Sequence, residues 1–260
     1  MSVDDQESRS YERFCAVTEA ETSRMAAAAR EAGPEAPVPT CPGWSVAKLL
    51  KHAGIVQRWA AHIVGGRVQA PISTRQVPVE LPGDPGDYPG WLEDGGRALT
   101  ATLRAADPGT PVWSWGPGGS AAFWARRMAH EAAVHRADAE IAAGLAPRFD
   151  ARLAADGVDE LLGNLGMVPA VAERLAALGE ENRTLHFHAT DLDGAGEWLV
   201  TLTPGGFTWE HGHGKGDVAA RGTAGDLLLL VYGRSDPASG RVEVFGDHGL
   251  LTRWLAATPI

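Results

Sequence analysis

Residues 123–138 read FWARRMAHEAAVHRAD, and this stretch has the periodicity of a helix with one inward face. Side chains spaced alternately by four and three residues lie on one face of a helix. Here that spacing selects Trp124, Met128, Glu131, His135 and Asp138. Because a buried carboxylate is costly unless a cation or a metal ion lies beside it, we expect an inward helix face that carries a polar site.

Helix-breaking residues predict three more helices before this one. Each apolar-periodic segment is followed by glycine or proline, which end helices. The four expected helices cover about residues 10–31, 44–64, 88–106 and 120–143. Four consecutive helices of this length predict an antiparallel four-helix bundle over residues 1–147.

The sequence changes character after Pro147, where short runs with strand character alternate with turn residues. We expect strands at residues 185–190, 198–203, 207–210, 218–220 and 241–245, and helices at residues 151–178, 224–232 and 249–257. Short strands mixed with helices predict a smaller α+β domain over residues 148–260. The fold class expected for the whole chain is therefore α+β.

Composition limits the classes of partner and compartment. The 260 residues are 44% apolar and carry a formal net charge of −10, so the chain can form a substantial core and repels phosphate backbones and anionic membranes. Cys15 and Cys41 lack metal-type spacing, although one disulfide is arithmetically possible. The first residues lack the features of a signal peptide, and no apolar run approaches the ~20 residues that span a bilayer. We expect a cytoplasmic protein that binds neither nucleic acid nor membrane; its oligomeric state is unknown.

The second expected helix adds a histidine to the polar site. His52 shares a helix face with Val56 and Trp59, the face that a bundle helix turns inward. Glu131 and His135 are four residues apart, so both side chains can reach one ion. Two imidazoles and one carboxylate are the ligands of several catalytic zinc sites, and the same set binds iron(II) or nickel(II). A hydrogen-bonded polar network is the alternative interpretation.

A second pattern in the same helix imitates a metalloprotease motif. Residues 130–135 read HEAAVH, whereas the protease motif requires two histidines four residues apart. His130 and His135 are five residues apart, about 140° around the helix at roughly 100° per residue. They cannot share an ion, so this spacing excludes a protease of that type.

Two charged neighbours of the polar site have two interpretations each. Arg127 forms either a surface ion pair, which we favour, or a functional contact that steadies Glu131 or meets the anionic part of a substrate. Asp138 either accepts the second ring N–H of His135 or pairs with a cation such as Arg136.

Histidines also recur in the second domain. His186 and His188 alternate along an expected strand and therefore share a face, and His211 and His213 flank a glycine. The sequence shows no carboxylate or cysteine pattern beside them, so we disfavour a metal site there. The proline-rich segment 66–89 is either a disordered tether or a lid over one end of the bundle.

Two stretches resemble the signatures of a known family. Residues 38–52, VPTCPGWSVAKLLKH, are similar to the N-terminal signature of mycothiol-dependent maleylpyruvate isomerase-like proteins, and residues 123–138 resemble their second signature. The resemblance continues through residues 185–191, 196–198 and 227–234, and so covers nearly the whole chain. It implies a DinB-like metal-binding four-helix bundle followed by a domain similar to sterol-carrier folds.

The resemblance also implies site residues and a cosubstrate. It implies zinc held by His52, Glu131 and His135, and a catalytic Arg234 that the second domain contributes to the active-site cleft. The family's cosubstrate is mycothiol, a low-molecular-weight thiol of actinobacteria.

Together these implications predict a zinc-dependent, mycothiol-using isomerase or thiol S-transferase. A metal-bound thiolate is a strong nucleophile toward a small electrophilic substrate, and an arginine can orient a substrate carboxylate. Isomerisation and transfer share the addition step and differ in whether the thiol leaves again. The alternatives are a non-enzymatic module that binds a metal or a small ligand, and a metal-dependent hydrolase that uses bound water.

Overall fold

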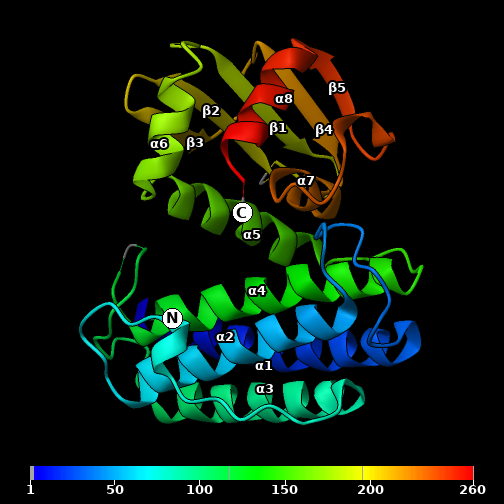
Figure 1. Cartoon of the computed structure of the whole chain (residues 1–260). Helices are drawn as coiled ribbons and strands as arrows, with labels where there is room; N and C mark the ends of the chain where they lie inside the picture. Colours follow the sequence, from blue (N-terminus) through cyan, green and yellow to red (C-terminus); the bar gives the residue numbers. More distant parts are fainter. Residues whose placement is uncertain (1–2, 117, 195, 260) are drawn as a thin grey trace. The chain divides into compact units, whose positions relative to one another are not determined.

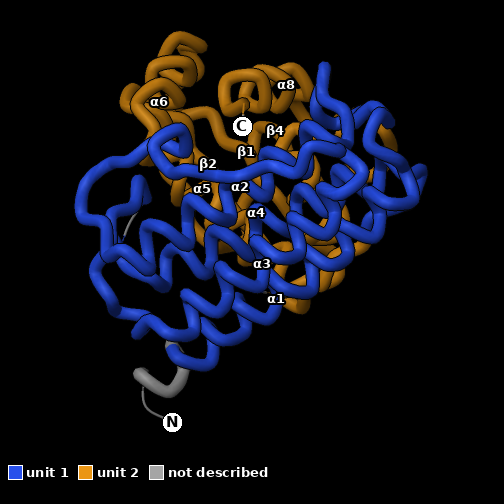
Figure 2. Tube along the Cα trace, turned by 60° about the horizontal axis from the view of Figure 1, so that its bottom comes forward, with its two compact units in different colours: residues 1–147 blue, residues 148–260 orange. Residues whose placement is uncertain are grey.

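The fold combines a helical first half with a second half in which helices flank a sheet (Figure 1). This computed structural model describes residues 3–116, 118–194 and 196–259, excluding the side chains of residues 3–7. Two compact units comprise residues 1–147 and 148–260, coloured blue and orange in Figure 2. The predicted α+β class is confirmed. No helix in the described ranges is long and apolar enough to cross a membrane.

Four helices form the first unit. They are α1 (Val3–Ala32), α2 (Val46–Gly65), α3 (Tyr88–Ala105) and α4 (Ala121–Ala142). Helices α1 and α2 each pack against both α3 and α4, which closes a ring of contacts and confirms the predicted four-helix bundle. Cys15 and Cys41 are both free and buried, so the disulfide that the composition allows is not formed.

Helix α4 is held against α1 by a buried guanidinium. The side chain of Arg136 is fully buried, and it donates to a carboxylate oxygen of Glu21 and to one of Glu140, both at 2.6 Å. Arg24 approaches the same two carboxylates from the more exposed side, at 3.1 Å and 2.9 Å. The two acidic side chains are thus neutralised from both sides, as buried charges require.

The proline-rich segment between α2 and α3 follows a defined path along these helices. It contains two short 3-10 turns, Thr74–Gln76 and Pro85–Asp87. The indole N–H of Trp59 on α2 donates to the Ile72 carbonyl at 3.0 Å, and that of Trp91 on α3 donates to the Glu80 carbonyl at 2.8 Å. These bonds argue against a free tether.

The second unit contains a five-stranded sheet in the order β3-β2-β1-β4-β5. Its strands are β1 (Thr184–Ala189), β2 (Glu197–Thr203), β3 (Gly206–His211), β4 (Val218–Gly222) and β5 (Glu243–Gly246). Strands β1 and β4 pair in parallel, and all other pairs are antiparallel. The helices are α5 (Ala151–Leu165), α6 (Pro169–Ala176), α7 (Ala224–Val231) and α8 (His248–Ala257).

One predicted element of this unit is wrong. The single helix expected over residues 151–178 is two helices, because α5 ends at Leu165 and α6 starts anew at Pro169. A proline lacks the N–H that a continuing helix needs, but it fits the first turn of a new one.

The two faces of the sheet differ in chemistry. Phe187 packs its ring against Trp254 of α8, and Trp198 donates its indole N–H to Asp159 of α5, so this face lies against the helices. Residues at the alternate positions of the same strands, including His186 and Glu197, project from the opposite face.

Replacing Arg136 with methionine tests the buried network between α1 and α4. The substitution leaves the carboxylates of Glu21 and Glu140 without their buried partner, so we expect the free energy of unfolding to fall by about 3–5 kcal/mol. Urea denaturation followed by circular dichroism measures this loss.

Arg24→Met is the matched control, because it removes ion pairs to the same two carboxylates from a side chain that is 46% exposed. Its expected loss is at most about 1 kcal/mol. Equal losses in the two variants would contradict the role given to the buried guanidinium.

Candidate metal centre

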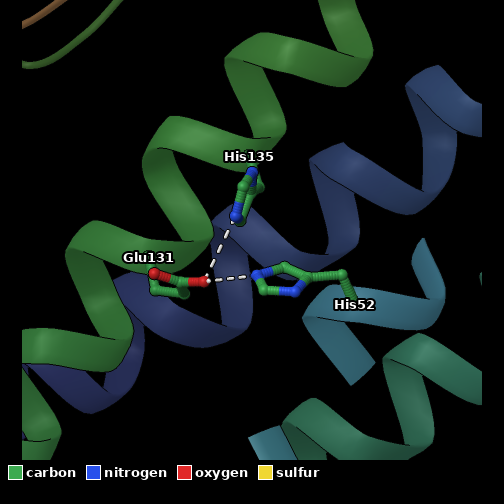
Figure 3. A group of neighbouring side chains, drawn as sticks. All are labelled: His52, Glu131 and His135. Carbon is green, nitrogen blue, oxygen red and sulfur yellow. Dashed lines mark hydrogen bonds and ion pairs between the residues drawn. The ribbon is translucent and has the colours of Figure 1, made fainter. Parts of the chain in front are cut away.

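Helices α2 and α4 bring three potential metal ligands together. Ser45 caps α2 by accepting a hydrogen bond from the Lys48 N–H at 3.4 Å, and His52 lies nearly two turns further on. Glu131 and His135 lie one turn apart on α4. The three side chains point toward one another from the two helices (Figure 3), as the helical spacing predicts.

The distances from Glu131 to the two imidazoles match those between neighbouring ligands of a tetrahedral site. One carboxylate oxygen of Glu131, Oε1, lies 3.3 Å from His52 Nε2 and 3.2 Å from His135 Nε2. All three atoms lie within 4.8 Å of one another. Zinc–ligand bonds of about 2.0–2.1 Å in a tetrahedron place neighbouring ligand atoms roughly 3.3–3.4 Å apart. The two separations from the carboxylate oxygen therefore suit a shared ion.

The two oxygens of Glu131 have separate partners. Oε2 accepts a hydrogen bond from Arg127 Nη2 at 3.0 Å, while Oε1 faces the two imidazoles. The Arg127 side chain is only 9% exposed, so the surface ion pair that we favoured from the sequence is wrong. Arg127 instead steadies the carboxylate from the protein side and leaves Oε1 for an ion.

Asp138 fixes the orientation of the second imidazole. Its Oδ2 lies 2.8 Å from His135 Nδ1, and its Oδ1 accepts a hydrogen bond from the Thr40 hydroxyl at 2.6 Å. Cys41 Sγ also donates to Oδ2, at 3.5 Å. A proton on Nδ1 leaves the Nε2 lone pair for a metal, which is the usual arrangement of a histidine ligand and its carboxylate partner.

The electrostatic balance of the group favours a bound cation. Burial raises the pKa of the Glu131 carboxyl, but His135, His52 and Arg127 together hold it well below its usual value. Burial lowers the pKa of His135, but the carboxylates of Glu131 and Asp138 raise it to about 9. Without an ion, a proton therefore occupies the position between Glu131 and His135 at neutral pH, and a metal would replace it.

Access to the group is from the His52 side. The His52 side chain is 39% exposed, whereas that of His135 is 8% exposed. The Trp44 ring lies edge-on to the His52 ring, with centroids 5.1 Å apart. Sequence reasoning missed Trp44 and Thr40, although both lie in the 38–52 signature.

An aromatic cluster occupies the bundle near the 110–120 loop. Trp113 and Trp115 pack against Trp59 and Trp124, with ring centroids 5.1–6.3 Å apart. Trp124 is fully buried and Trp115 is 39% exposed. Packing within the bundle is therefore the first role of these residues, as their aromatic character suggests.

The fourth predicted site residue belongs to the second unit. Arg234 follows α7, and its Nη1 donates to the Tyr232 carbonyl at 2.8 Å. The catalytic role of Arg234 stays a prediction.

Similar solved structures share the fold of the whole chain. The mycothiol-dependent maleylpyruvate isomerase is 13% identical, with a TM-score of 0.56 over 94% of this chain and 95% of that chain. A histidine-to-alanine mutant of that enzyme is 12% identical, with a TM-score of 0.58 over 94% and 95%. At this identity the likeness concerns the fold alone.

Family comparison covers both units of the chain. Residues 15–140 match the mycothiol maleylpyruvate isomerase N-terminal domain, and residues 152–253 match the MDMPI C-terminal domain. No curated protein matches the sequence. Because the two matched domains account for most of the chain, the protein belongs to the mycothiol maleylpyruvate isomerase family.

Proposed function

We propose that the protein is a zinc-dependent, mycothiol-using isomerase or thiol S-transferase that acts on a small electrophilic substrate. One observation carries the proposal: a carboxylate oxygen on a buried helix lies 3.2–3.3 Å from two imidazole nitrogens, at the spacing of tetrahedral zinc ligands. Family membership supports the thiol cosubstrate. A cytoplasmic location is part of the proposal.

His52, Glu131 and His135 would hold the ion, and these three ligands leave a position for a further molecule. When bound, zinc supplies a Lewis acid that favours the thiolate form of a thiol at neutral pH. Iron(II) and nickel(II) suit the same ligand types, so the ligand set alone does not select zinc.

The chain's own residues position these ligands. Arg127 neutralises the outer oxygen of Glu131, and Asp138 keeps the proton of His135 on Nδ1. Helix α4 is buried along this stretch, which limits competing water around the buried ligands. The more exposed His52 lies on the side from which a thiol can approach.

The reaction class follows from thiol addition. A thiolate that adds to an activated carbon–carbon double bond forms a C–S bond and leaves a single bond that can rotate. The addition places an electron pair on the activating group. Its return expels the thiolate and restores the double bond in the other geometry, which is isomerisation; protonation of the neighbouring carbon with the C–S bond retained is transfer. We propose that Arg234 binds a substrate carboxylate by paired hydrogen bonds.

Zinc binding provides the first test. We expect His52→Ala to lose one equivalent of tightly bound zinc relative to the unmodified protein, because two remaining ligands hold an ion far more weakly than three. Competition with a chromophoric chelator measures the affinity and the stoichiometry.

His62→Ala is the control, since His62 is an exposed histidine on the same helix outside the ligand group. It should bind zinc like the unmodified protein. Identical zinc binding by both variants and the unmodified protein would remove the basis for a metal centre here.

The orienting role of Asp138 is tested by Asp138→Asn. The amide keeps the size of the side chain but loses the negative charge that holds the His135 proton, so zinc affinity should fall roughly 10–100-fold. Thr40→Val removes one donor to Asp138 and leaves the charge, so its effect should be smaller. Undiminished zinc affinity in Asp138→Asn would show that His135 does not depend on this contact.

Thiol-dependent turnover is the decisive functional assay. Zinc-loaded protein is incubated with mycothiol and a panel of electrophiles, some of which carry a carboxylate and one of which is maleylpyruvate. The products are identified by mass spectrometry. We expect an isomer or a thioether only when both zinc and mycothiol are present. Arg234→Ala should raise KM most for carboxylate-bearing electrophiles.

Two other outcomes of these assays would each identify a different function. Turnover of an ester or amide without thiol would identify a metal-dependent hydrolase. Zinc retention with no thiol affinity by calorimetry, and no product from any electrophile, would identify a binding module. Either result would overturn the proposed thiol chemistry.

A further inference from the structure

Three histidine side chains surround one carboxylate on the sheet of the second unit. His186 and His188 lie on β1, and Glu197 is the first residue of β2. The antiparallel pairing of β1 and β2 places Glu197 opposite His188 and diagonal to His186. Residues in these positions project from the same face of a sheet and can touch.

The third histidine reaches this carboxylate from a turn. His213 lies just beyond the end of β3, and the preceding Gly212 has a φ of +153°. The Gly212 N–H donates to the Glu197 carbonyl at 3.2 Å, which fixes the turn beside β2. A turn held at Glu197 in this way keeps the His213 ring within reach of its carboxylate.

The distances define a compact group of ligand atoms. Glu197 Oε2 lies 2.9 Å from His186 Nε2 and 2.7 Å from His213 Nδ1, and 4.0 Å from His188 Nδ1. The ligand atoms of His186, Glu197 and His213 lie within 4.8 Å of one another. The ring centroids of the three histidines are 5.4–6.5 Å apart.

A hydrogen-bonded network accounts for only part of this arrangement. One carboxylate can accept hydrogen bonds from the rings of His186 and His213, but it carries one negative charge while a third imidazole, that of His188, lies 4.0 Å away. Protonation of more than one ring would place like charges side by side. A divalent ion instead attracts neutral imidazoles and the carboxylate together, and it needs an opening of only about 0.5 Å between the ligand atoms to reach tetrahedral spacing.

We propose that His186, Glu197 and His213 form a second transition-metal site, with His188 available as a fourth ligand. Two or three imidazoles with one carboxylate suit zinc, nickel(II) and copper(II), whereas calcium and magnesium prefer oxygen ligands alone. This group belongs to residues 148–260, whereas the His52 group belongs to residues 1–147.

An ion at this site would cross-link neighbouring strands and stabilise the sheet. Its ligands come from β1, from β2 and from the segment after β3, so one ion would tie three consecutive stretches of chain together. An ion that binds only the folded state stabilises it. The proposed consequence is a zinc-dependent rise in the melting temperature of the second unit.

The test is a zinc titration of the full chain, read by equilibrium dialysis with elemental analysis and by thermal melting. We expect His213→Gln to lose one equivalent of zinc and the zinc-dependent stabilisation that comes with it. This variant should fold, because the His213 side chain is 78% exposed. His211→Gln is the matched control, since His211 lies on the same strand end but its Nε2 faces Asp159 at 3.2 Å.

Glu197→Gln separates a metal site from a hydrogen-bonded network. The amide oxygen still accepts a hydrogen bond, so the melting temperature without metal should change little, while zinc affinity at this group falls at least tenfold. Cobalt(II) should show the intense visible absorption of a tetrahedral site in His52→Ala, where the first group is disabled, and not in the double variant His52→Ala, His213→Gln.

Two outcomes would overturn the second site. One is zinc stoichiometry that is unchanged in His213→Gln and Glu197→Gln. The other is the loss of all bound zinc in His52→Ala alone. Neither outcome bears on thiol-dependent turnover by the first group.

Discussion

The two oxygens of the Glu131 carboxylate have different partners, a guanidinium on one side and two imidazoles on the other. The candidate metal centre of the bundle depends on this arrangement. Arg127 takes Oε2, so a charged side chain on a buried helix has one permanent cationic partner. Oε1 then faces His52 and His135 at distances suited to a shared ion. The chain of contacts continues through His135 to Asp138 and from Asp138 to Thr40. Each polar group in this chain has its partner, which is what allows it to lie inside the bundle.

Helix α4 carries two groups of polar side chains with different roles. Arg127, Glu131, His135 and Asp138 recur at intervals of three and four residues and form the candidate centre. Arg136 and Glu140 lie on another side of the helix and bind it to Glu21 of α1. The structural network fixes the position of α4, and therefore the position of the ligands that the same helix presents to α2.

Similar ligand sets occur on two kinds of scaffold. In the first unit, the i, i+4 spacing of a helix places a glutamate beside a histidine, and a neighbouring helix adds a second histidine. In the second unit, the pairing of two strands places a glutamate beside two histidines, and a glycine turn adds a third. The Glu131–His135 pair is readable from the sequence because its spacing is local, whereas the sheet set depends on strand register.

This difference explains which features could be predicted from the sequence. The four helices, the α+β class and the pairing of Glu131 with His135 follow from local spacing and helix breakers. The inward face of α2 and the family resemblance added His52, and the packing of α2 against α4 brings it beside them. Glu197 was missed because its nearness to His186 arises only when β1 and β2 pair around the turn between them. The break before Pro169 was missed because the apolar period continues across it. The burial of Arg127 depends on tertiary packing, which spacing within one helix does not report.

Zinc-edge anomalous diffraction from crystals of the zinc-loaded protein shows whether an ion lies among His52, Glu131 and His135. We expect a peak about 2.0–2.2 Å from His52 Nε2, Glu131 Oε1 and His135 Nε2 together. A map of the loaded protein with no anomalous peak among these three atoms would contradict this expectation, since the imidazoles and the carboxylate would then only be bonded to one another.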